Sequence, residues 1–91
     1  MRDDRFEWDD RKAASNLRKH ELSFELARLV FDDPHAIEEP DDEVEEERWQ
    51  RIGLAQGRLL TVVHTFRGSR IRIISARKAD SHEQDIYFTQ R

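Results

Sequence analysis

The first third of the chain changes from an alternating pattern of polar and apolar residues to two helical patterns. Residues 5–8, Arg-Phe-Glu-Trp, alternate polar and aromatic side chains, which predicts a short strand. Asp9 or Asp10 can then cap a helix that runs to about His20, because a carboxylate accepts the unpaired N–H groups of a first helical turn. The apolar face of this helix is expected to hold Ala13, Ala14 and Leu17, and a polar face Lys12, Asn16 and Lys19.

A second helix is expected to begin at Ser23, whose hydroxyl can accept a hydrogen bond from the first turn. Four apolar residues then recur at helical spacing, namely Phe24, Ala27, Val30 and Phe31. Asp32-Asp33-Pro34 ends this element, because proline cannot continue a helix. Near the end of the chain, Asp80 and Glu83 have the spacing of a capping box, which predicts a short terminal helix that includes Tyr87.

The second half of the chain has the pattern of a β-sheet. Three segments are expected to be strands: residues 48–55, 59–66 and 71–76. Gly68-Ser69 between the last two suits a two-residue hairpin turn. That turn pairs Arg67 with Arg70 and places His64 opposite Ile73 on the core side, where a buried histidine is expected to be hydrogen-bonded.

The open face of this hairpin is expected to carry Arg67, Arg70 and Arg72 near the turn. In a regular hairpin Arg77 falls on the opposite face, because side chains alternate along a strand. Arg67 and Arg77 can share a face only if a β-bulge turns one of them round; otherwise only one of them belongs to a common site. Together the elements predict one α+β domain over residues 1–91, with a small antiparallel sheet of three to four strands, two N-terminal helices and a short C-terminal helix.

Charge divides the chain into an acidic and a basic half. Residues 1–47 hold 17 acidic and 7 basic side chains, residues 48–91 hold 3 and 9, and the net charge of the whole chain is −4. The basic half suits an anionic partner, although the two halves could equally neutralise each other within the fold. Residues 38–47 include eight acids and are expected to form a solvated loop between two strands. Such a loop could instead contact a basic partner or shield the basic half.

Several classes of function lack the residues that they need. The chain has no Cys, and its three Gly form neither a phosphate-binding loop nor a dinucleotide-binding motif. The four histidines are 15, 29 and 18 residues apart, so no pair has metal-ligand spacing, and no metal or other cofactor is expected. Because no apolar run is long enough for a membrane span and the N-terminus is unlike a signal peptide, we expect a cytoplasmic protein with no membrane partner.

The arginine-rich sheet remains as the candidate for chemistry. Guanidinium groups bind phosphate through two parallel hydrogen bonds and stay charged at any working pH. Arginines on an open face could therefore hold a nucleic-acid backbone and stabilise charge that develops on a phosphorus centre. Alternatively, they keep an exposed sheet soluble by charge.

Motifs along nearly the whole chain resemble the BrnT family of bacterial toxins. The resemblance rests on these segments, in order: Glu7-Trp8-Asp9, Lys12, Asn16-Leu17-Arg18-Lys19-His20, Ser23-Phe24-Glu25, Val30-Phe31-Asp32-Asp33-Pro34, Glu46-Glu47-Arg48-Trp49, Ile52-Gly53 and residues 70–79, RIRIISARKA. The family looks like the RelE-type ribonucleases in fold, which implies a small antiparallel sheet with helices packed on it. The resemblance also implies RNA cleavage without a metal, and neutralisation by a ribbon-helix-helix antitoxin called BrnA.

In cleavage of this kind the ribose 2′-hydroxyl attacks the adjacent phosphorus, which requires a general base, a general acid and charge stabilisation. The residues that the resemblance implies as catalytic are Arg67, Arg77, Lys19 and His20. The two arginines would bind phosphate and stabilise the transition state, and Lys19 and His20 would transfer protons. The residues expected to bind RNA are Lys12, Arg70, Arg72 and Tyr87.

Simpler structural roles stay open for several of these residues. Lys12 and Lys19 could form a solvated helix face, and His20 could complement the dipole at the end of its helix. Tyr87 could be a packing residue whose hydroxyl reaches water.

The resemblance implies a partner as well as a substrate. Ribbon-helix-helix antitoxins dimerise, so we expect a complex of two toxins and two antitoxins that contacts promoter DNA only through the antitoxin. An acidic antitoxin segment could cover Arg67, Arg70 and Arg72, or a basic segment could engage residues 38–47. The alternative function is a BrnT-like binding module that has lost catalysis and acts only in a DNA-binding repressor complex.

Overall fold

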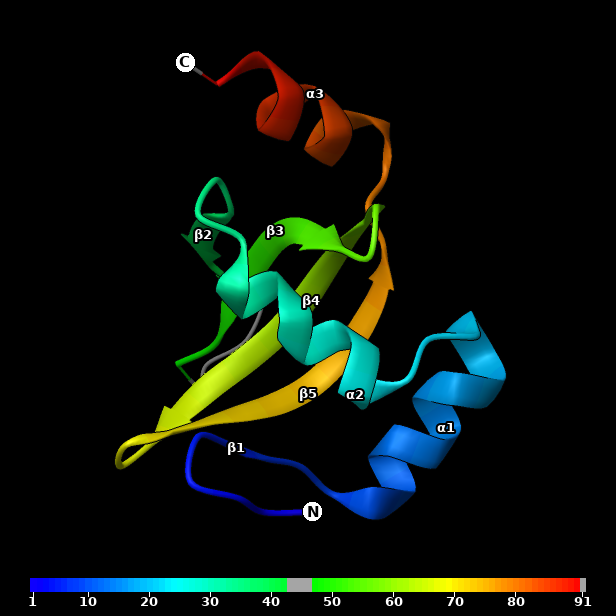
Figure 1. Cartoon of the computed structure of the whole chain (residues 1–91), viewed down its shortest axis with the longest axis vertical. Helices are drawn as coiled ribbons and strands as arrows, with labels where there is room; N and C mark the ends of the chain where they lie inside the picture. Colours follow the sequence, from blue (N-terminus) through cyan, green and yellow to red (C-terminus); the bar gives the residue numbers. More distant parts are fainter. Residues whose placement is uncertain (43–46, 91) are drawn as a thin grey trace.

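The computed structural model describes residues 1–42 and 47–90 and arranges them as a five-stranded sheet, three α-helices and a 3₁₀ helix (Figure 1). The elements are, in chain order, β1 (Phe6–Glu7), α1 (Asp10–His20), α2 (Phe24–Ala27), the 3₁₀ helix η1 (Arg28–Asp32), β2 (Ile37–Pro40), β3 (Trp49–Ala55), β4 (Arg58–Arg67), β5 (Arg70–Lys78) and α3 (Ser81–Thr89). The α+β class predicted from the sequence is therefore confirmed.

The α-helices begin at the residues that the sequence predicts. The Asp9 side chain accepts a hydrogen bond from the Lys12 N–H at the start of α1, and the Ser23 hydroxyl accepts one from the Leu26 N–H at the start of α2. At the start of α3, Asp80 and Glu83 form a complete capping box, in which each side chain accepts from the backbone of the other residue.

The second helix is shorter than predicted, because the α-helix ends at Ala27 and continues as the tighter 3₁₀ helix η1. The sequence spacing of Val30 and Phe31 does not distinguish these two helix types. Packing against β3 is close at Gly53, where an added Cβ would lie only 3.1 Å from the Cβ atoms of Val30 and Ala36. Tertiary packing of this kind can override a helical sequence pattern.

The sheet is larger than predicted and is mixed rather than antiparallel. Its strand order is β1-β5-β4-β3-β2, and β1 runs parallel to β5 while the other neighbours are antiparallel. The expectation of three to four antiparallel strands was wrong, because β1 joins the sheet beside the distant strand β5 and runs parallel to it. Phe6 of β1 pairs with Ile71 of β5. The two-residue strand β1 is thus an edge strand that forms only through its long-range pairing with β5.

The fifth strand, β2, contradicts part of the predicted acidic loop. Glu38 and Glu39 belong to β2 and pair with Arg51 and Gln50 of β3, whereas residues 43–46 of the predicted loop lie outside the described residues. The Glu38 carboxylate lies 2.7 Å from the ring Nε2 of His64 and 3.7 Å from Arg51. These contacts offset the charge repulsion that the sequence pattern suggests. They also confirm that His64, fully buried, is a hydrogen-bonded core histidine.

The β4–β5 hairpin has the predicted register near its turn and a β-bulge further along. Arg67 pairs with Arg70 and His64 with Ile73, but Val63 then pairs with Ser75, so Ile74 is an extra residue in β5. The bulge reverses the alternation of side chains beyond it. Arg77, opposite Thr61, consequently lies on the same face as Arg67, and its predicted place on the core face in a regular hairpin is wrong.

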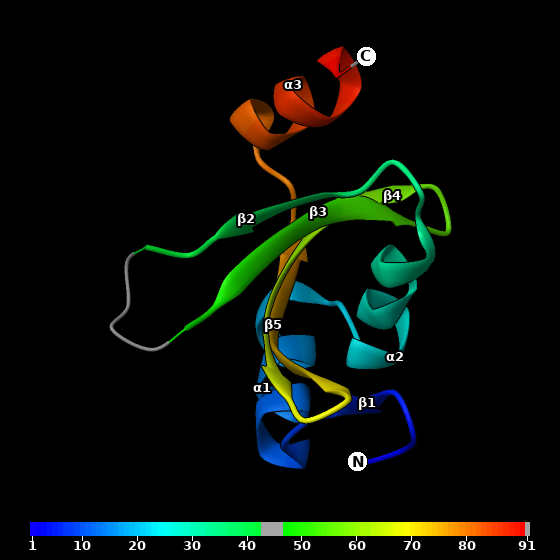
Figure 2. The ribbon, with the colours of Figure 1, turned by 90° about the vertical axis from the view of Figure 1, so that its left-hand side faces the viewer.

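The core lies between the sheet and the segment formed by α2 and η1, which covers one face (Figure 2). Its buried side chains are Phe6, Trp8, Leu22, Phe24, Ala27, Val30, Ala55, Leu60, Val62, Ile73 and Ala76. The predicted faces of α1 are only partly correct, because Leu17 is 51% exposed and Asn16 is only 6% exposed. A polar side chain therefore takes the most buried position of this helix.

Asn16 is buried because its amide joins α1 to the edge of β5. Its Nδ2 donates to the carbonyl oxygens of Leu22 (3.0 Å) and Ala76 (2.9 Å), and its Oδ1 accepts from the Ala76 N–H (3.0 Å). The two bonds to Ala76 replace the hydrogen bonds that a neighbouring strand would make beyond the short β1. One side chain thereby satisfies three backbone groups.

Replacing Asn16 should destabilise the fold strongly. Asn16→Ala leaves up to three buried backbone groups unpaired, and we expect the free energy of unfolding in urea to fall by about 3 kcal/mol. Ser15→Ala is the matched control, because Ser15 is an exposed neighbour on the same helix, and it should change stability by less than about 0.5 kcal/mol. Equal stabilities for the two variants would contradict this role for Asn16.

Tyr87 docks α3 onto the connection between η1 and β2. Its side chain is 6% exposed, and its hydroxyl donates to Asp33 Oδ2 over 2.6 Å. The same Asp33 oxygen accepts from the Leu54 N–H of β3 at 2.8 Å. Burial, together with the bond to the Asp33 carboxylate, raises the pKa of Tyr87 to about 12 from its ordinary value of about 10.

This raised pKa predicts a loss of stability at alkaline pH. Below pH 10 Tyr87 is neutral in both the folded and the unfolded chain, so its contribution is complete. Between pH 10 and about 12 the unfolded chain releases the proton more readily, so the free energy of unfolding should decline. Tyr87→Phe should lack this part of the decline. Because Tyr87 is the single tyrosine of the chain, tyrosinate absorbance reports its pKa directly, and a value near 10 in the folded protein would contradict the prediction.

Candidate functional site

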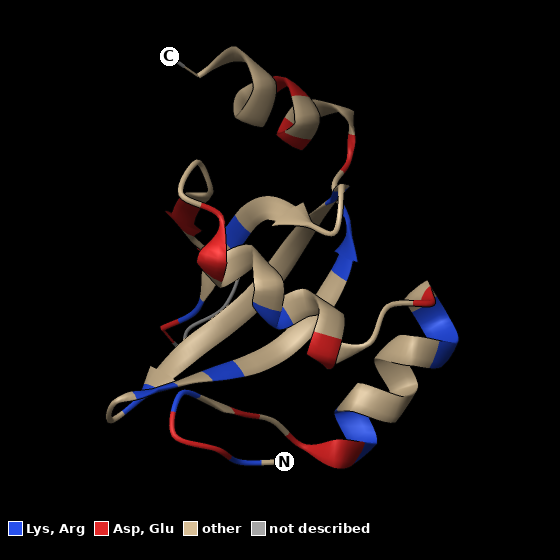
Figure 3. Cartoon of the chain, viewed as in Figure 1, with Lys and Arg blue, Asp and Glu red and all other residues tan. Residues whose placement is uncertain are grey.

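The face of the sheet opposite α2 and η1 gathers the arginines of the second half of the chain. Strand register places Arg67 of β4 and Arg70, Arg72 and Arg77 of β5 on this side, and we call them the arginine face. Helix α3 contacts β3 at the Arg77 end of this side, where Ile52 and Thr61 are buried. Figure 3 shows basic residues along β5, at the β4–β5 turn and on α1 beside them. The bulge at Ile74 is what brings both ends of β5 onto one face.

A groove of about 180 Å³ runs between α1 and β5 next to the arginine face. From α1 it is lined by Lys12, Ser15, Asn16, Lys19 and His20, and from β5 by the two residues at the bulge, Ile74 and Ser75. The predicted clustering of Lys12, Asn16 and Lys19 on one side of the helix is therefore confirmed. Lys12, Lys19 and His20 are exposed, so their polar atoms are open to a ligand that enters the groove.

Three of the four arginines are held by oxygen atoms from other segments. Arg70 Nε donates to the Asp3 carbonyl oxygen (2.7 Å) and Arg72 Nη1 to Glu7 Oε2 (2.7 Å). Arg77 donates to both carboxylate oxygens of Glu83, at 2.6 and 2.8 Å. Arg67 makes no hydrogen bond or ion pair within residues 1–42 and 47–90, so its charge is the least compensated of the four.

The ion pairs keep their carboxylates charged. The hydrogen bond from Arg72 lowers the pKa of Glu7. Burial alone would raise the pKa of Glu83, but the hydrogen bonds from Arg77 and from the Asp80 N–H lower it overall. The hydrogen bond to Glu83 raises the pKa of Arg77 in turn. These arginines are therefore fixed cations whose positions are set by fixed anions.

The structure brings together most, but not all, of the residues proposed from the sequence. Seven of them line the arginine face or the adjoining groove: Arg67, Arg70, Arg72, Arg77, Lys12, Lys19 and His20. Tyr87 is separate, because its buried hydroxyl is bonded to Asp33 rather than turned toward the groove. Sequence reasoning missed Glu7 and Glu83 as partners of the arginines. Glu83 was recognised only as a capping residue, and no local pattern signals its contact with Arg77.

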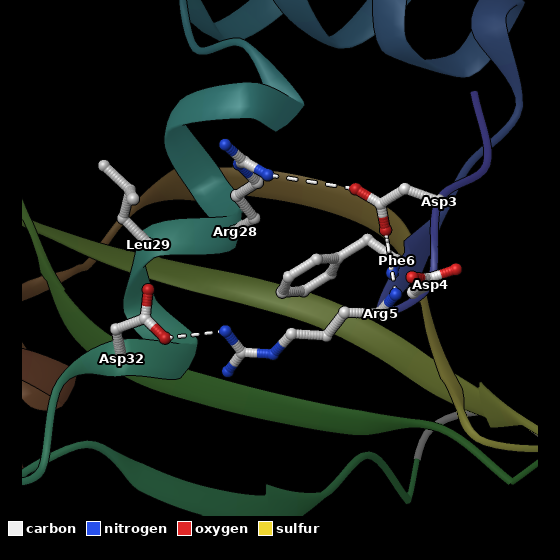
Figure 4. Close-up of a pocket in the computed structure, with 7 residues that line it drawn as sticks. All are labelled: Asp3, Asp4, Arg5, Phe6, Arg28, Leu29 and Asp32. Carbon is white, nitrogen blue, oxygen red and sulfur yellow. Dashed lines mark hydrogen bonds and ion pairs between the residues drawn. The ribbon is translucent and has the colours of Figure 1, made fainter.

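A second groove, of about 370 Å³, lies between the N-terminal segment and η1 (Figure 4). Its charged residues neutralise one another, since Arg5 pairs with Asp32 at 2.7 Å and Arg28 with Asp3 at 3.9 Å. None of the residues proposed from the sequence as catalytic or RNA-binding lines it. The smaller groove beside the arginine face is therefore the better candidate for chemistry.

Two further features bear on the class of protein. Within the described residues, no three His, Asp or Glu side chains converge in a way that could hold a metal ion. No helix in that part of the chain has the length and apolar character needed to cross a membrane.

A comparison with protein families gives a match over most of the chain. The model of a family described as "Ribonuclease toxin, BrnT, of type II toxin-antitoxin system" matches residues 8–83 of the 91-residue chain. No curated protein matches the chain. The matched region includes both sides of the groove, from the cap of α1 to Glu83 of α3. The chain therefore belongs to the BrnT family of ribonuclease toxins of type II toxin–antitoxin systems.

Proposed function

We infer that this protein is a toxin that cleaves RNA at the arginine face without a metal ion. Family membership supports a ribonuclease, and the site residues are those that the resemblance implies, which lie on the arginine face or in the adjoining groove. The observation that carries the proposal is the bulge at Ile74, which puts Arg77 on one face with Arg67 and Arg72, beside the groove that holds Lys19 and His20. A phosphate on this face meets several cations, and the proton donors and acceptors of α1 lie next to it.

The proposed reaction is attack of the ribose 2′-hydroxyl on the adjacent phosphorus, with departure of the 5′-oxygen of the next nucleotide. Arg77 binds the non-bridging oxygens and stabilises the negative charge that develops on them. Arg67 lies six residues along β4 from Thr61, the partner of Arg77, which is roughly 20 Å of strand, so it binds a more distant phosphate of the same RNA. His20 and Lys19 are the candidates for removing the 2′ proton and protonating the leaving oxygen, since both lie exposed in the groove. Lys12, Arg70 and Arg72 hold the flanking phosphates.

Tyr87 has a different role in this proposal from the one expected from the sequence. Its buried hydroxyl and raised pKa make it a poor acid or base at neutral pH. We therefore assign Tyr87 to the docking of α3, and through α3 to the support of Arg77, rather than to direct RNA binding.

Removing either arginine should slow RNA cleavage. Because Arg77 makes a charged contact with the transition state, Arg77→Ala should lower the rate by roughly 10²–10³-fold. Arg67→Ala should slow cleavage mainly by weakening RNA binding, because Arg67 contacts a more distant phosphate. Arg28→Ala is the matched control, because Arg28 is an exposed arginine on η1, which packs on the opposite face of the sheet, and it should cleave at the parental rate. The assay uses purified protein and RNA with excess EDTA.

Three outcomes of this assay count against the proposal. Parental rates in both folded arginine variants would remove the assignment of the site. Loss of all cleavage in EDTA would indicate a metal-dependent hydrolase. Intact RNA at high excess of the parental protein would favour the alternative, a non-catalytic module that acts only in a repressor complex.

The family implies an antitoxin partner, and we propose that it is a ribbon-helix-helix protein in a complex of two toxins and two antitoxins. Such an antitoxin would bring the complex to its promoter, and the toxin would not contact the DNA. We further propose that an acidic antitoxin segment covers the arginine face and inhibits the toxin by occupying the phosphate sites. The charge of Arg67, the least compensated of the four arginines, is the feature that favours this mode over binding of a basic segment to the acidic region.

Charge reversal distinguishes the two binding modes. In a variant with Arg67→Glu, Arg70→Glu and Arg72→Glu, like charges would face the acidic segment, and association should be abolished in a pull-down or calorimetric titration with the antitoxin. The corresponding Arg→Gln variant, which removes charge without reversing it, should bind with intermediate affinity. Unchanged binding in both folded variants would indicate that the antitoxin engages another surface.

A further inference from the structure

Arg77 is distinguished from the other arginines of its face by a carboxylate that grips one end of its guanidinium group. Nη1 lies 2.6 Å from Glu83 Oε1, and Nη2 lies 2.8 Å from Oε2. Nη1 also donates to the Lys78 carbonyl oxygen over 3.4 Å. Arg72, by comparison, donates to Glu7 through Nη1 alone, at 2.7 Å.

These contacts determine which donors of Arg77 stay available. A guanidinium group has five N–H bonds in a fixed planar fork. The end formed by Nη1 and Nη2 is occupied by Glu83, and the remaining Nη1 hydrogen faces Lys78. The Nε–H and the second Nη2–H have no partner within the described residues. They lie on one edge of the fork, at the spacing that fits two oxygens of a phosphate.

Glu83 is itself fixed firmly enough to orient a partner. It is 6% exposed, its Oε1 accepts from the Asp80 N–H at 2.9 Å, and its own N–H donates to Asp80 Oδ1 at 2.9 Å. The capping box thus joins the start of α3 to the Arg77 side chain, which is 36% exposed. Because Glu83 occupies the Nη1/Nη2 end, the Nε/Nη2 edge is the remaining place where an anion can accept two parallel hydrogen bonds from Arg77.

We propose that Glu83 is a positioning residue for RNA cleavage, which holds Arg77 so that its Nε/Nη2 edge binds two oxygens of the phosphate that is attacked. This inference rests on the proposed function and names the atoms of that site. Glu83 does not contact the substrate; it acts through Arg77. A side chain free to rotate would lose this alignment, and misplacement of a catalytic group by about 1 Å can cost about 10²-fold in rate.

Glu83→Gln removes the charge but keeps an oxygen that can accept from the Asp80 N–H. We expect kcat to fall about 10²-fold with little change in KM, because alignment matters most in the transition state. Gln84→Ala is the matched control, since it removes the hydrogen bond from Gln84 to the Ala79 carbonyl oxygen at the start of α3 and leaves Glu83 with both Asp80 and Arg77. It should destabilise α3 while keeping most of the activity.

Two further variants make the test independent of general effects on folding. If Glu83 acts through Arg77, Glu83→Gln should cause no additional loss in an Arg77→Ala background, whereas a merely structural effect would multiply. Arg77→Lys keeps the charge and a contact to Glu83 but offers no bidentate edge, so it should lose nearly as much activity as Arg77→Ala. Multiplying losses, or an Arg77→Lys variant that is close to parental in rate, would overturn the proposal.

A binding measurement separates this proposal from the proposed function. In the parental protein, inorganic phosphate should shift the NMR signal of the Arg77 Nε–H, and Glu83→Gln should abolish that shift. If the parental protein cleaves no RNA but shows the shift, the ribonuclease assignment is wrong, whereas phosphate binding at the Nε/Nη2 edge of Arg77 is supported. If the Arg77 Nε–H signal does not respond to phosphate, the positioning role is wrong whatever the cleavage assay shows.

Discussion

The irregular pairing of β4 with β5 is the constraint on which the arrangement of charges depends. With Ile74 as an extra residue, Arg77 shares a face with Arg67, and Ala76 turns into the core. Without the bulge, alternation would bury the Arg77 guanidinium beneath α2 and η1 at a high cost in desolvation. The amide of Asn16 binds both backbone groups of Ala76, two residues past the bulge, and so holds the altered register in place. The same residue anchors α1, whose exposed cations line the other side of the groove.

An acidic protein can present a basic surface because its charges are segregated rather than balanced locally. The second half of the chain, residues 48–91, has few acidic residues. The most buried of them, Glu83, accepts hydrogen bonds from Arg77. Glu7 likewise pairs with Arg72. Glu38 contacts His64 and Arg51 on the other face of the sheet. The carboxylates near the arginine face thus orient cations instead of cancelling the whole patch. Binding to polyanions should accordingly depend only shallowly on salt concentration, because few phosphates can be neutralised.

Local rules were sufficient for the parts of the fold that local chemistry determines. Helix caps at Asp9, Ser23 and Asp80, and the register near Gly68-Ser69, follow from side-chain oxygens and turn geometry within a few residues. Long-range contacts decided the rest. The parallel position of β1, the change from α2 to η1 and the burial of Asn16 depend on partners that no nearby residue reveals.

The candidate site shows the same division. Its arginines could be proposed from strand alternation and from the resemblance of the sequence to the BrnT family. The sequence could not decide whether Arg67 and Arg77 share a face, because a single inserted residue reverses the alternation of side chains. The sequence of β5 is uniformly suited to a regular strand and does not reveal the insertion. Glu83 was visible as a capping residue, but its second use as a partner of Arg77 appears only when α3 folds back beside the end of β5.

The pairing of β1 with β5 has a consequence for the timing of activity. Bonds that close the sheet at this edge join residues 60 to 67 positions apart, among them Asn16 to Ala76, Glu7 to Arg72 and Asp3 to Arg70. Contacts of such high sequence separation form late and slow folding. During synthesis the N-terminal segment can contact η1 early, through Arg5 and Asp32, but its partners in β5 are made much later. The edge of the arginine face formed by β1, β5 and α1 can therefore close only after β5 has been synthesised.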